Sequence, residues 1–246
     1  MKEITSVNNP LIKELALLKN KKERLNKQTF MVEGYHLVEE AYKRNCLVQI
    51  LTTSDKDKIN YSDIDIIKTT DIVIKKLSST IEPQGIIGIV KMPVFEKKNY
   101  TKYLILDDVA DPGNLGTIIR SSLALGIDAL IVSPDTVDEY NDKVLRATQG
   151  AIFKLPIYRE DLKTAINDLK EQQIPVLATS LKGAVDVATL PRMESFAIVL
   201  GNEARGVKEE LVDLSDKVIK VTMHNNVESL NVGVAAGMIA YYLINK

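Results

Sequence analysis

The sequence predicts an α/β protein in which a small N-terminal domain precedes a larger domain built on a mainly parallel sheet. Three observations predict this class. The chain has 246 residues, 45% of them hydrophobic, so it can bury more than one core. Between Lys91 and Lys102 no apolar period is sustained, which places a domain boundary near residue 98. Beyond that point short apolar strands alternate with helices, the order typical of parallel sheets covered on both faces.

Residues 1–98 are expected to form a small α/β unit. Leucines recur at roughly helical spacing after the Asn9-Pro10 start signal, which predicts one amphipathic helix over residues 10–27. Short β-rich runs follow and alternate with helical stretches. The expected strands are Phe30–Val32, Leu47–Thr52 and Ile86–Val90, and the expected helices are Leu37–Lys43 and Ile72–Leu77.

Residues 99–246 show a more regular alternation. The expected strands are Tyr103–Leu106, Ala129–Val132, Ala151–Ile157, Val176–Thr179, Phe196–Leu200 and Val218–Val221. The expected helices are Thr117–Leu125, Asp142–Thr148, Leu162–Glu171, one that starts near Lys208, and Leu230–Leu243. Ligands of such sheets bind beyond the carboxyl ends of the strands, so the loops there are where functional residues are expected.

Composition excludes several classes of protein. Cys46 is the single cysteine, so no internal disulfide can form, and His36 and His224 are too far apart for the usual spacing of metal ligands. We therefore expect a cytoplasmic protein without a metal site. No apolar run approaches the ~18 residues that span a bilayer, so neither a membrane segment nor export is expected.

Charge permits a nucleic-acid ligand without establishing one. The net charge is −1, but residues 1–30 hold seven basic groups against three acidic ones, a local balance of +4 that leaves −5 for the remainder. Phosphate contacts need such clustering of Lys and Arg. From charge alone, the solvated face of a helix is the favoured interpretation. The candidates for phosphate contacts in this run are Lys21, Lys22 and Arg24.

The first informative loop, residues 111–116, joins the strand ending near Asp107 to the next helix. Pro112 and Gly113 turn the chain, and Asn114 is predicted to cap the helix and leave its amide hydrogens facing a ligand. An ordinary strand-to-helix turn would explain the glycines. It explains Arg120 less well, because a guanidinium beside a strand's carboxyl end is costly unless it meets phosphate or carboxylate.

Two further loops follow late in the chain. Residues 200–206 carry Gly201 and Gly206, which let the backbone approach a ligand closely, and Glu203, which adds a carboxylate at the same sheet edge. Ser229 and Asn231 lie at the head of the last helix, where either one could merely be its cap. Nearly all the side chains around that helix are small or apolar. The helix must therefore be buried in the core or across a subunit interface.

These three loops, in this order and with this spacing, resemble the three motifs of the SpoU (TrmH) family of RNA 2′-O-ribose methyltransferases in the knotted SPOUT superfamily. Between the first two motifs the resemblance extends to Lys143, Arg146, Ala147, Gly150, Ala151 and Phe153. The N-terminal half resembles an L30e-like RNA substrate-binding domain. The residues that carry this resemblance are Asn9-Pro10, Phe30, Glu33-Gly34, Glu40-Ala41 and Pro83-Gln84-Gly85. The likeness therefore covers nearly the whole chain.

The resemblance implies an enzyme that transfers a methyl group from S-adenosylmethionine to a ribose 2′-hydroxyl of structured RNA, with 23S rRNA favoured over tRNA. It implies an RNA-binding domain at residues 1–98, a catalytic domain at residues 99–246 with a deep C-terminal trefoil knot, and a homodimer formed through that domain. Because a guanidinium holds its proton too tightly to be a good base, we expect Arg120 to anchor phosphate and stabilise the developing alkoxide, with the base unassigned.

Residue roles carry over from the matching motif positions. The implied catalytic residues are Arg120, Asn114, Glu203, Ser229 and Asn231. The implied cofactor-binding residues are Thr179, Gly201, Val221, Met223, Leu230 and Asn231, and the expected RNA contacts are Lys21, Lys22, Arg24 and Arg146. Thr222 stands where the family commonly has proline, and His224-Asn225-Asn226 replaces an often glycine-containing segment, so the cofactor loop could differ in shape.

Three alternatives stay open at the level of sequence. An NAD-dependent oxidoreductase is disfavoured, because the Gly-x-Gly-x-x-Gly fingerprint is absent after Leu106. A non-catalytic RNA-binding assembly protein of the same fold is disfavoured by the joint presence of Arg120, Glu203 and Asn231. Methylation of a base nitrogen, as other knotted methyltransferases perform, would leave the product linkage sensitive to alkali.

Overall fold

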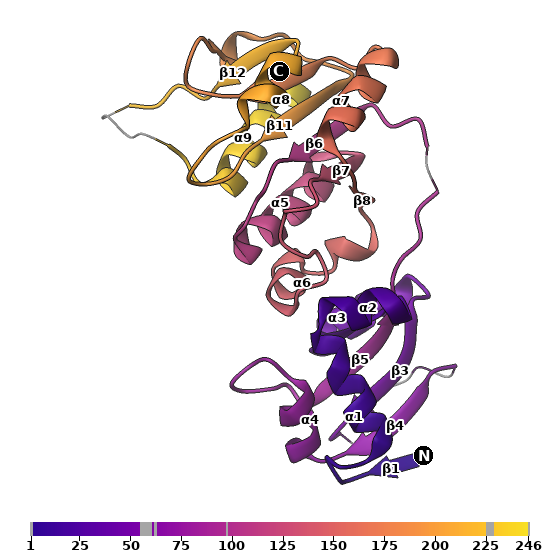
Figure 1. The fold of residues 1–246 in the computed structure, drawn as a ribbon. Coiled ribbons are helices and arrows are strands. Elements are labelled where there is room, and N and C mark those ends of the chain that lie inside the picture. The colour runs from indigo at the N-terminus through magenta and orange to yellow at the C-terminus, as the bar shows by residue number, and fades with distance from the viewer. Residues whose placement is uncertain (1, 55–60, 62, 97, 225–228, 246) are drawn as a thin grey trace. The chain divides into compact units, whose positions relative to one another are not determined.

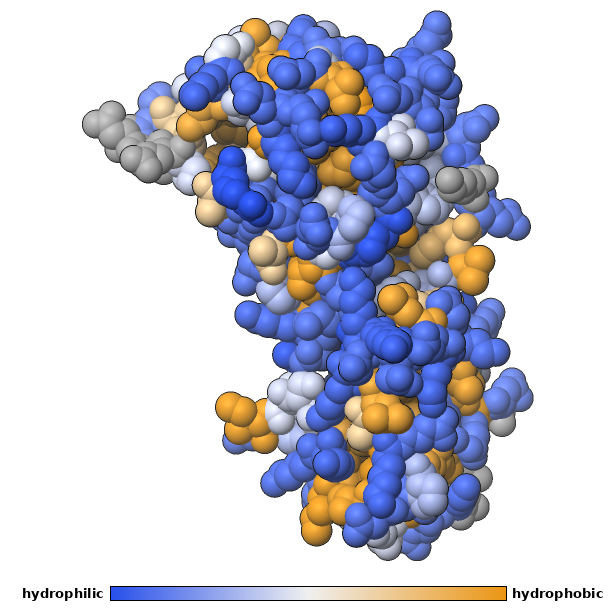
Figure 2. Space-filling view, viewed as in Figure 1, coloured by the Kyte–Doolittle hydropathy of each residue, from blue (hydrophilic) through white to orange (hydrophobic). Residues whose placement is uncertain are grey.

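The computed structural model describes residues 2–54, 61, 63–96, 98–224 and 229–245. These residues form two compact units. One comprises Met1–Phe95 together with Tyr140–Phe153, and the other comprises Glu96–Glu139 together with Lys154–Lys246. Within the described residues, no helix has both the length and the apolar character to cross a membrane. Exposed residues are mostly hydrophilic on the face drawn in Figure 2, with hydrophobic residues in scattered patches.

The first unit is built on a five-stranded mixed sheet, in which β5 runs antiparallel to β3 and β2 and the other pairs are parallel. The three strands expected in this half are present. The two that were not expected are short or mostly polar. In spatial order the strands are β1 (Lys2–Ile4), β4 (Asp65–Thr69), β3 (Leu47–Thr52), β5 (Ile86–Lys91) and β2 (Thr29–Glu33).

The prediction of a single helix over residues 10–27 is wrong, because the helix is interrupted at Asn20. The chain forms α1 (Pro10–Ala16), a 3₁₀ turn η1 (Leu17–Lys19) and α2 (Lys21–Lys27). Asn20 has extended backbone, and its side-chain oxygen accepts a hydrogen bond from the Lys22 amide at 2.8 Å. Asparagine thus caps a new helix instead of continuing the old one. Among the described residues before 95, two further α-helices form, α3 (Tyr35–Lys43) and α4 (Asp71–Leu77).

A later stretch of chain, Tyr140–Phe153, packs into this first unit. It contains α6 (Asp142–Thr148) and the 3₁₀ turn η3 (Ala151–Phe153). The Phe30 ring lies 4.7 Å from that of Tyr140 and 6.2 Å from that of Phe153. The strand predicted over residues 151–157 is therefore wrong, because its apolar start fills this core as a 3₁₀ turn and only β8 (Ile157–Arg159) pairs with the sheet of the second unit.

The second unit contains a seven-stranded sheet in which every strand pair is parallel, as predicted. Neighbours in the sheet are often distant in sequence, so that β6 lies beside β11 (Figure 1). In spatial order the strands are β10 (Val185–Asp186), β12 (Lys217–Lys220), β9 (Val176–Thr179), β11 (Phe196–Leu200), β6 (Lys102–Leu106), β7 (Ala129–Val132) and β8.

Helices cover both faces of this sheet. Leu104, Ile105 and Leu106 are all buried although successive residues of a strand point to opposite faces. One face packs against α7 (Leu162–Glu171) and α8 (Glu209–Leu214). Two longer helices, α5 (Pro112–Leu125) and α9 (Val232–Asn245), pack against each other. Both faces are thus buried, whereas threading of the C-terminal part through a knot stays a prediction.

Candidate active site

The first loop runs from the end of β6 into α5. The side chain of Asp111, not that of Asn114, caps the helix, and it accepts a hydrogen bond from the Asn114 amide at 2.8 Å. The predicted helix start was therefore wrong by five residues. Asp111 competes successfully because an aspartate directly before a proline at the first helical position is a strong start signal. Asn114 lies in the first turn instead, where its side chain can reach other loops.

The second loop folds into a tight turn after β11. The backbones of Asn202 and Gly206 bond to each other in both directions, at 3.1 and 2.8 Å. Asn202 also accepts the amides of Ala204 and Arg205 on its side-chain oxygen, at 2.9 and 3.2 Å. A side chain at Gly201 would overlap the backbone of Gly206, so only glycine fits at this position.

Glu203 projects from this turn to the start of α5 and joins the second loop to the first. Its carboxylate accepts hydrogen bonds from Asn114 Nδ2 at 2.8 Å, the Asp111 amide at 3.3 Å and the Ala110 amide at 3.4 Å. Burial alone would raise the pKa of Glu203, but these hydrogen bonds, first among them that from Asn114, outweigh it and lower the pKa below its ordinary value. The carboxylate is therefore ionised at neutral pH.

The third loop reaches the same place through Asn231. Its Nδ2 donates to Asn114 Oδ1 at 2.7 Å, and its Oδ1 accepts the amides of Gly233 and Val234 at 2.9 and 3.2 Å, which caps α9. Asn114 consequently lies between Glu203 and Asn231 and bonds to both. Three loops spread over more than a hundred residues of sequence thus meet in one series of polar contacts.

The other two expected catalytic residues lie apart from this chain of contacts. Arg120 is exposed about two turns into α5. It follows Asn114 and Thr117 at three-residue spacing, so the three residues lie along one side of the helix. Ser229 is exposed just before α9. Among the residues that the structure describes, neither side chain has a hydrogen-bond or ion-pair partner. Both can therefore contact a ligand without breaking an internal interaction.

The expected cofactor positions gather at one sheet edge. Thr179 ends β9, Gly201 follows β11 and Val221 follows β12, and these three strands are neighbours whose carboxyl ends meet. Met223 and Leu230 lie on the loop beyond β12 and are half-buried. The three strand ends to which the resemblance assigns the cofactor are therefore adjacent. The intervening residues 225–228 lie outside the described part.

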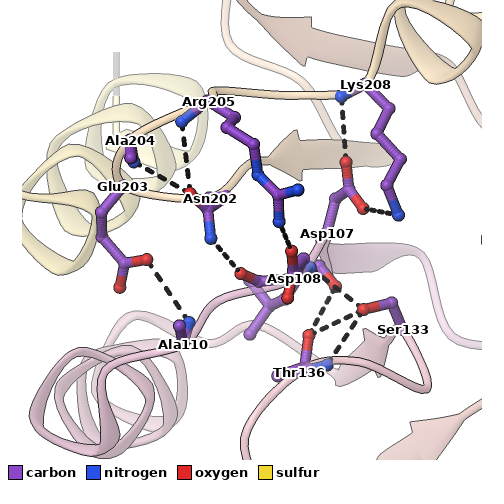
Figure 3. Close-up of polar contacts among 11 residues, drawn as sticks. Asp107, Asp108, Ala110, Ser133, Thr136, Asn202, Glu203, Ala204, Arg205 and Lys208 are labelled. Atoms are coloured by element: carbon purple, nitrogen blue, oxygen red, sulfur yellow. Dashed lines mark hydrogen bonds and ion pairs between the residues drawn. The ribbon is translucent and has the colours of Figure 1, made fainter.

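Sequence reasoning missed a set of polar residues beneath the second loop (Figure 3). Asp107 and Asp108 follow β6 directly. The buried Asp107 carboxylate accepts the Lys208 amide at 2.9 Å, and its Oδ1 lies 3.1 Å from Lys208 Nζ. Asp108 forms an ion pair with Arg205, and its carbonyl accepts Asn202 Nδ2 at 2.8 Å. Two adjacent acids at a strand's carboxyl end were the available signal.

The expected RNA contacts belong to the first unit, and the structure separates them into two kinds. Lys21 and Lys22 are exposed on α2. Arg24 is buried, and its Nη1 donates to the carbonyls of Leu18 and Lys19 at 2.8 and 2.9 Å. Arg146 pairs with Asp142 at 2.9 Å on α6. Arg24 and Arg146 both line a cavity of about 80 Å³.

Comparison with known protein families matches most of the chain. The family model described as the SpoU rRNA Methylase family matches residues 101–241, and the MRM3-like substrate binding domain matches residues 9–88. The chain belongs to the SpoU rRNA methylase family. The resemblance drawn from the three motifs and from the N-terminal residues is thereby confirmed.

Individual relatives extend over the full length. The 23S rRNA (guanosine(2553)-2′-O)-methyltransferase RlmP of Bacillus subtilis is 36% identical over 246 residues, 99% of either chain. A solved rRNA methyltransferase from Sinorhizobium meliloti superposes with a TM-score of 0.87 at 28% identity, covering 98% of this chain and 96% of that one. A solved RNA 2′-O ribose methyltransferase superposes with a TM-score of 0.84 at 27% identity, covering 98% and 97%.

A further solved structure is the AdoMet-bound form of the Sinorhizobium meliloti enzyme, with a TM-score of 0.83 at 29% identity, covering 98% of this chain and 97% of that one. Family membership and full-length relatives together identify the activity. This protein is an S-adenosylmethionine-dependent RNA methyltransferase that modifies a ribose 2′-hydroxyl. The predicted enzyme class and cofactor are confirmed.

Proposed function

We propose that the substrate is 23S rRNA and that the product is the 2′-O-methylated guanosine formed by the Bacillus subtilis relative. The observation that carries this proposal is the length of the match, because the RlmP relative aligns with 99% of this chain and so includes the N-terminal unit. A solved tRNA-modifying TrmH/SpoU enzyme from A. aeolicus covers only 60% of this chain, with a TM-score of 0.54. We propose on the same ground that the enzyme acts in the cytoplasm.

Mapping ribose methylation tests the target. In RNA from a strain lacking the gene, one 23S guanosine should become sensitive to alkaline cleavage, because a free 2′-hydroxyl can attack its own phosphodiester. Purified protein and cofactor should restore resistance on unmodified 23S rRNA. Methylation lost from a tRNA, with 23S rRNA unchanged, would contradict the proposal and favour the tRNA alternative.

The proposed mechanism assigns one task to each group around the three loops. When bound, the cofactor supplies a sulfonium methyl carbon whose leaving group is already activated. Arg120, exposed on α5, binds an RNA phosphate and stabilises the alkoxide that develops on the ribose oxygen. Because a guanidinium stays protonated, Arg120 does not accept the ribose proton. Glu203 is a weak base, since its pKa is held low, so the proton acceptor stays unassigned.

The remaining proposed site residues position the reactants. Glu203, Asn114 and Asn231 order the loops through their shared hydrogen bonds, and Ser229 faces solvent where the substrate would arrive. The cofactor is proposed to lie at the carboxyl ends of β9, β11 and β12. The residues proposed to hold it are Thr179, Gly201, Val221, Met223, Leu230 and Asn231.

RNA binding is assigned to residues 1–98 and methyl transfer to residues 99–246, with α6 contributing to the former unit. Lys21 and Lys22 are the proposed phosphate contacts of α2, because their ammonium groups are exposed. Arg146 is half-buried beside Asp142 and lines one cavity with Lys19 and Arg24, and it is proposed as a further RNA contact there. The buried guanidinium of Arg24 bonds to two carbonyls, so we assign it to holding η1 and α2 together.

We further propose a homodimer formed through α9. Val234, Met238 and Tyr241 are 50%, 36% and 58% exposed and recur at helical spacing, so they form an apolar stripe along this helix. Burying this stripe against a second copy would remove it from water. Tyr241→Glu should then convert a dimer to a monomer in light scattering or sedimentation. A wild-type monomer at micromolar concentration would contradict the proposal.

A further inference from the structure

Asp108 has an unusual backbone for a non-glycine residue, with a φ of 58° in the left-handed region. Every polar group of this residue has a partner. Its amide donates to Ser133 Oγ at 3.0 Å, its carbonyl accepts Asn202 Nδ2 at 2.8 Å, and its carboxylate, 16% exposed, pairs with Arg205. Strained backbone persists only where the surroundings over-determine it, and such positions cluster at functional sites.

The two contacts from Asp108 to the second loop flank Glu203. Asn202 precedes Glu203 and Arg205 follows it by two residues, so Asp108 holds the turn on both sides of the carboxylate. Asp107 adds a further attachment at Lys208, where the ion pair raises the pKa of the lysine. The second loop is therefore fastened beneath Glu203, while Glu203 itself bonds to the first loop.

We propose that Asp108 and Arg205 are positioning residues for methyl transfer, which act by fixing Glu203 against Asn114. The Arg205 side chain is 72% exposed, and an exposed ion pair contributes little to stability. Its value lies instead in limiting the positions open to the turn. A shift of Glu203 would pass through Asn114 to Asn231, and misplacement by about 1 Å can slow an enzyme on the order of 10²-fold. This inference rests on the proposed role of Glu203.

Two kinds of variant separate the charge from the backbone. Asp108→Gly keeps the left-handed conformation at no steric cost and removes the carboxylate. Asp108→Asn also tolerates this conformation and keeps one acceptor for Arg205 without the charge. Arg205→Gln tests the partner on an exposed side chain, and Arg205→Lys restores a cation. Arg192→Gln is the matched control, because Arg192 pairs with Glu194 at 3.0 Å on the surface of the same unit.

The measurement is the single-turnover rate of methyl transfer at saturating cofactor and saturating 23S rRNA fragment, with thermal unfolding in parallel. We expect a rate about tenfold lower for Asp108→Gly and Arg205→Gln, a smaller loss for Asp108→Asn and near recovery for Arg205→Lys. The double variant of Asp108→Gly with Arg205→Gln should be no slower than either single variant. Arg192→Gln should match the wild type.

Combination with Glu203→Gln decides whether the two residues act through Glu203. In that background Asp108→Gly should cause no further loss, because the group being positioned is already altered. A multiplied loss, or a wild-type rate for both single variants, would overturn the proposal. If Glu203→Gln alone were as fast as the wild type, the role of Glu203 would fail first, and the two failures are thus distinguishable. Should Asp108→Gly not fold, Arg205→Gln carries the same test.

Discussion

Replacing Asn114 with aspartate alters the centre of the three-loop contact without changing its shape. Asn114 Nδ2 donates to Glu203 at 2.8 Å, so Asn114→Asp places two carboxylates at about that separation. Even at the dielectric constant of water, two unit charges 2.8 Å apart repel by about 1.5 kcal/mol, close to a tenfold change in an equilibrium. The contact should open at neutral pH, and the rate of methyl transfer should fall at least tenfold.

The pH dependence of this variant identifies the cause. Repulsion raises the pKa of the carboxyl pair, and a shared proton would restore the missing donor at low pH. In the wild type the pKa of Glu203 is lowered, so its contact with Asn114 is fully formed at any pH above the ordinary pKa of a glutamate. The contact is lost only as the pH falls through the lowered pKa of Glu203. The ratio of variant to wild-type rate should therefore rise as the pH falls from 8 to 5. A flat ratio, or a variant as fast as the wild type, would refute the reasoning.

Three further predictions address binding and stability. Lys21→Gln with Lys22→Gln should flatten the slope of log K against log salt for RNA by about 0.7–0.9 per lost phosphate contact while leaving cofactor affinity unchanged; an unchanged slope would return both lysines to a solvated face. Arg24→Leu should lower the free energy of unfolding by about 2–3 kcal/mol in urea, because one buried and one part-buried carbonyl lose a charged donor. Stability equal to the wild type would contradict this. Gly201→Ala should cost about 1–3 kcal/mol and weaken cofactor binding in calorimetry, since its Cβ would overlap the turn backbone.

Most regular elements of the second unit follow from the sequence, because their strands are short apolar runs and their helices are amphipathic. Val176–Thr179 and Leu162–Glu171 have the predicted bounds. Errors occur where a side chain competes with the backbone pattern. Asn20 splits the first predicted helix and Asp111 starts α5 early, each by accepting an amide hydrogen bond. Such competition depends on side-chain orientation, which apolar periodicity does not register.

The candidate site is partly accessible from sequence for a related reason. Loops at the carboxyl ends of parallel strands meet at one edge, so Asn114, Glu203 and Asn231 could be grouped in advance. The partners of Asp107 and Asp108 could not, because they depend on β11 lying next to β6 across about ninety residues of chain. Counting charges along the sequence also wrongly predicts Arg24 as an RNA contact, because its guanidinium donates to carbonyls of the preceding turn η1.

The negative charge of Glu203 sets the direction of every hydrogen bond in the series that joins Glu203, Asn114 and Asn231. An ionised carboxylate only accepts, so Asn114 must turn its amide nitrogen toward Glu203 and its oxygen toward Asn231. Asn231 must then donate through nitrogen, which leaves its oxygen to accept the amides of Gly233 and Val234. One charge on the second loop thereby sets the cap of α9.

Glu203→Gln should disturb this order although it changes no volume. A neutral amide at position 203 can donate as well as accept, so both asparagine side chains are free to reverse and present nitrogen to α9, where it cannot cap. Amide hydrogen exchange should become faster at Gly233 and Val234, while the first turn of α7, capped by Asp161 on its own, serves as the internal control. If exchange at α9 stayed at the wild-type rate while methyl transfer slowed, the charge of Glu203 would act on the reaction directly, and the chain of oriented amides would not be its means.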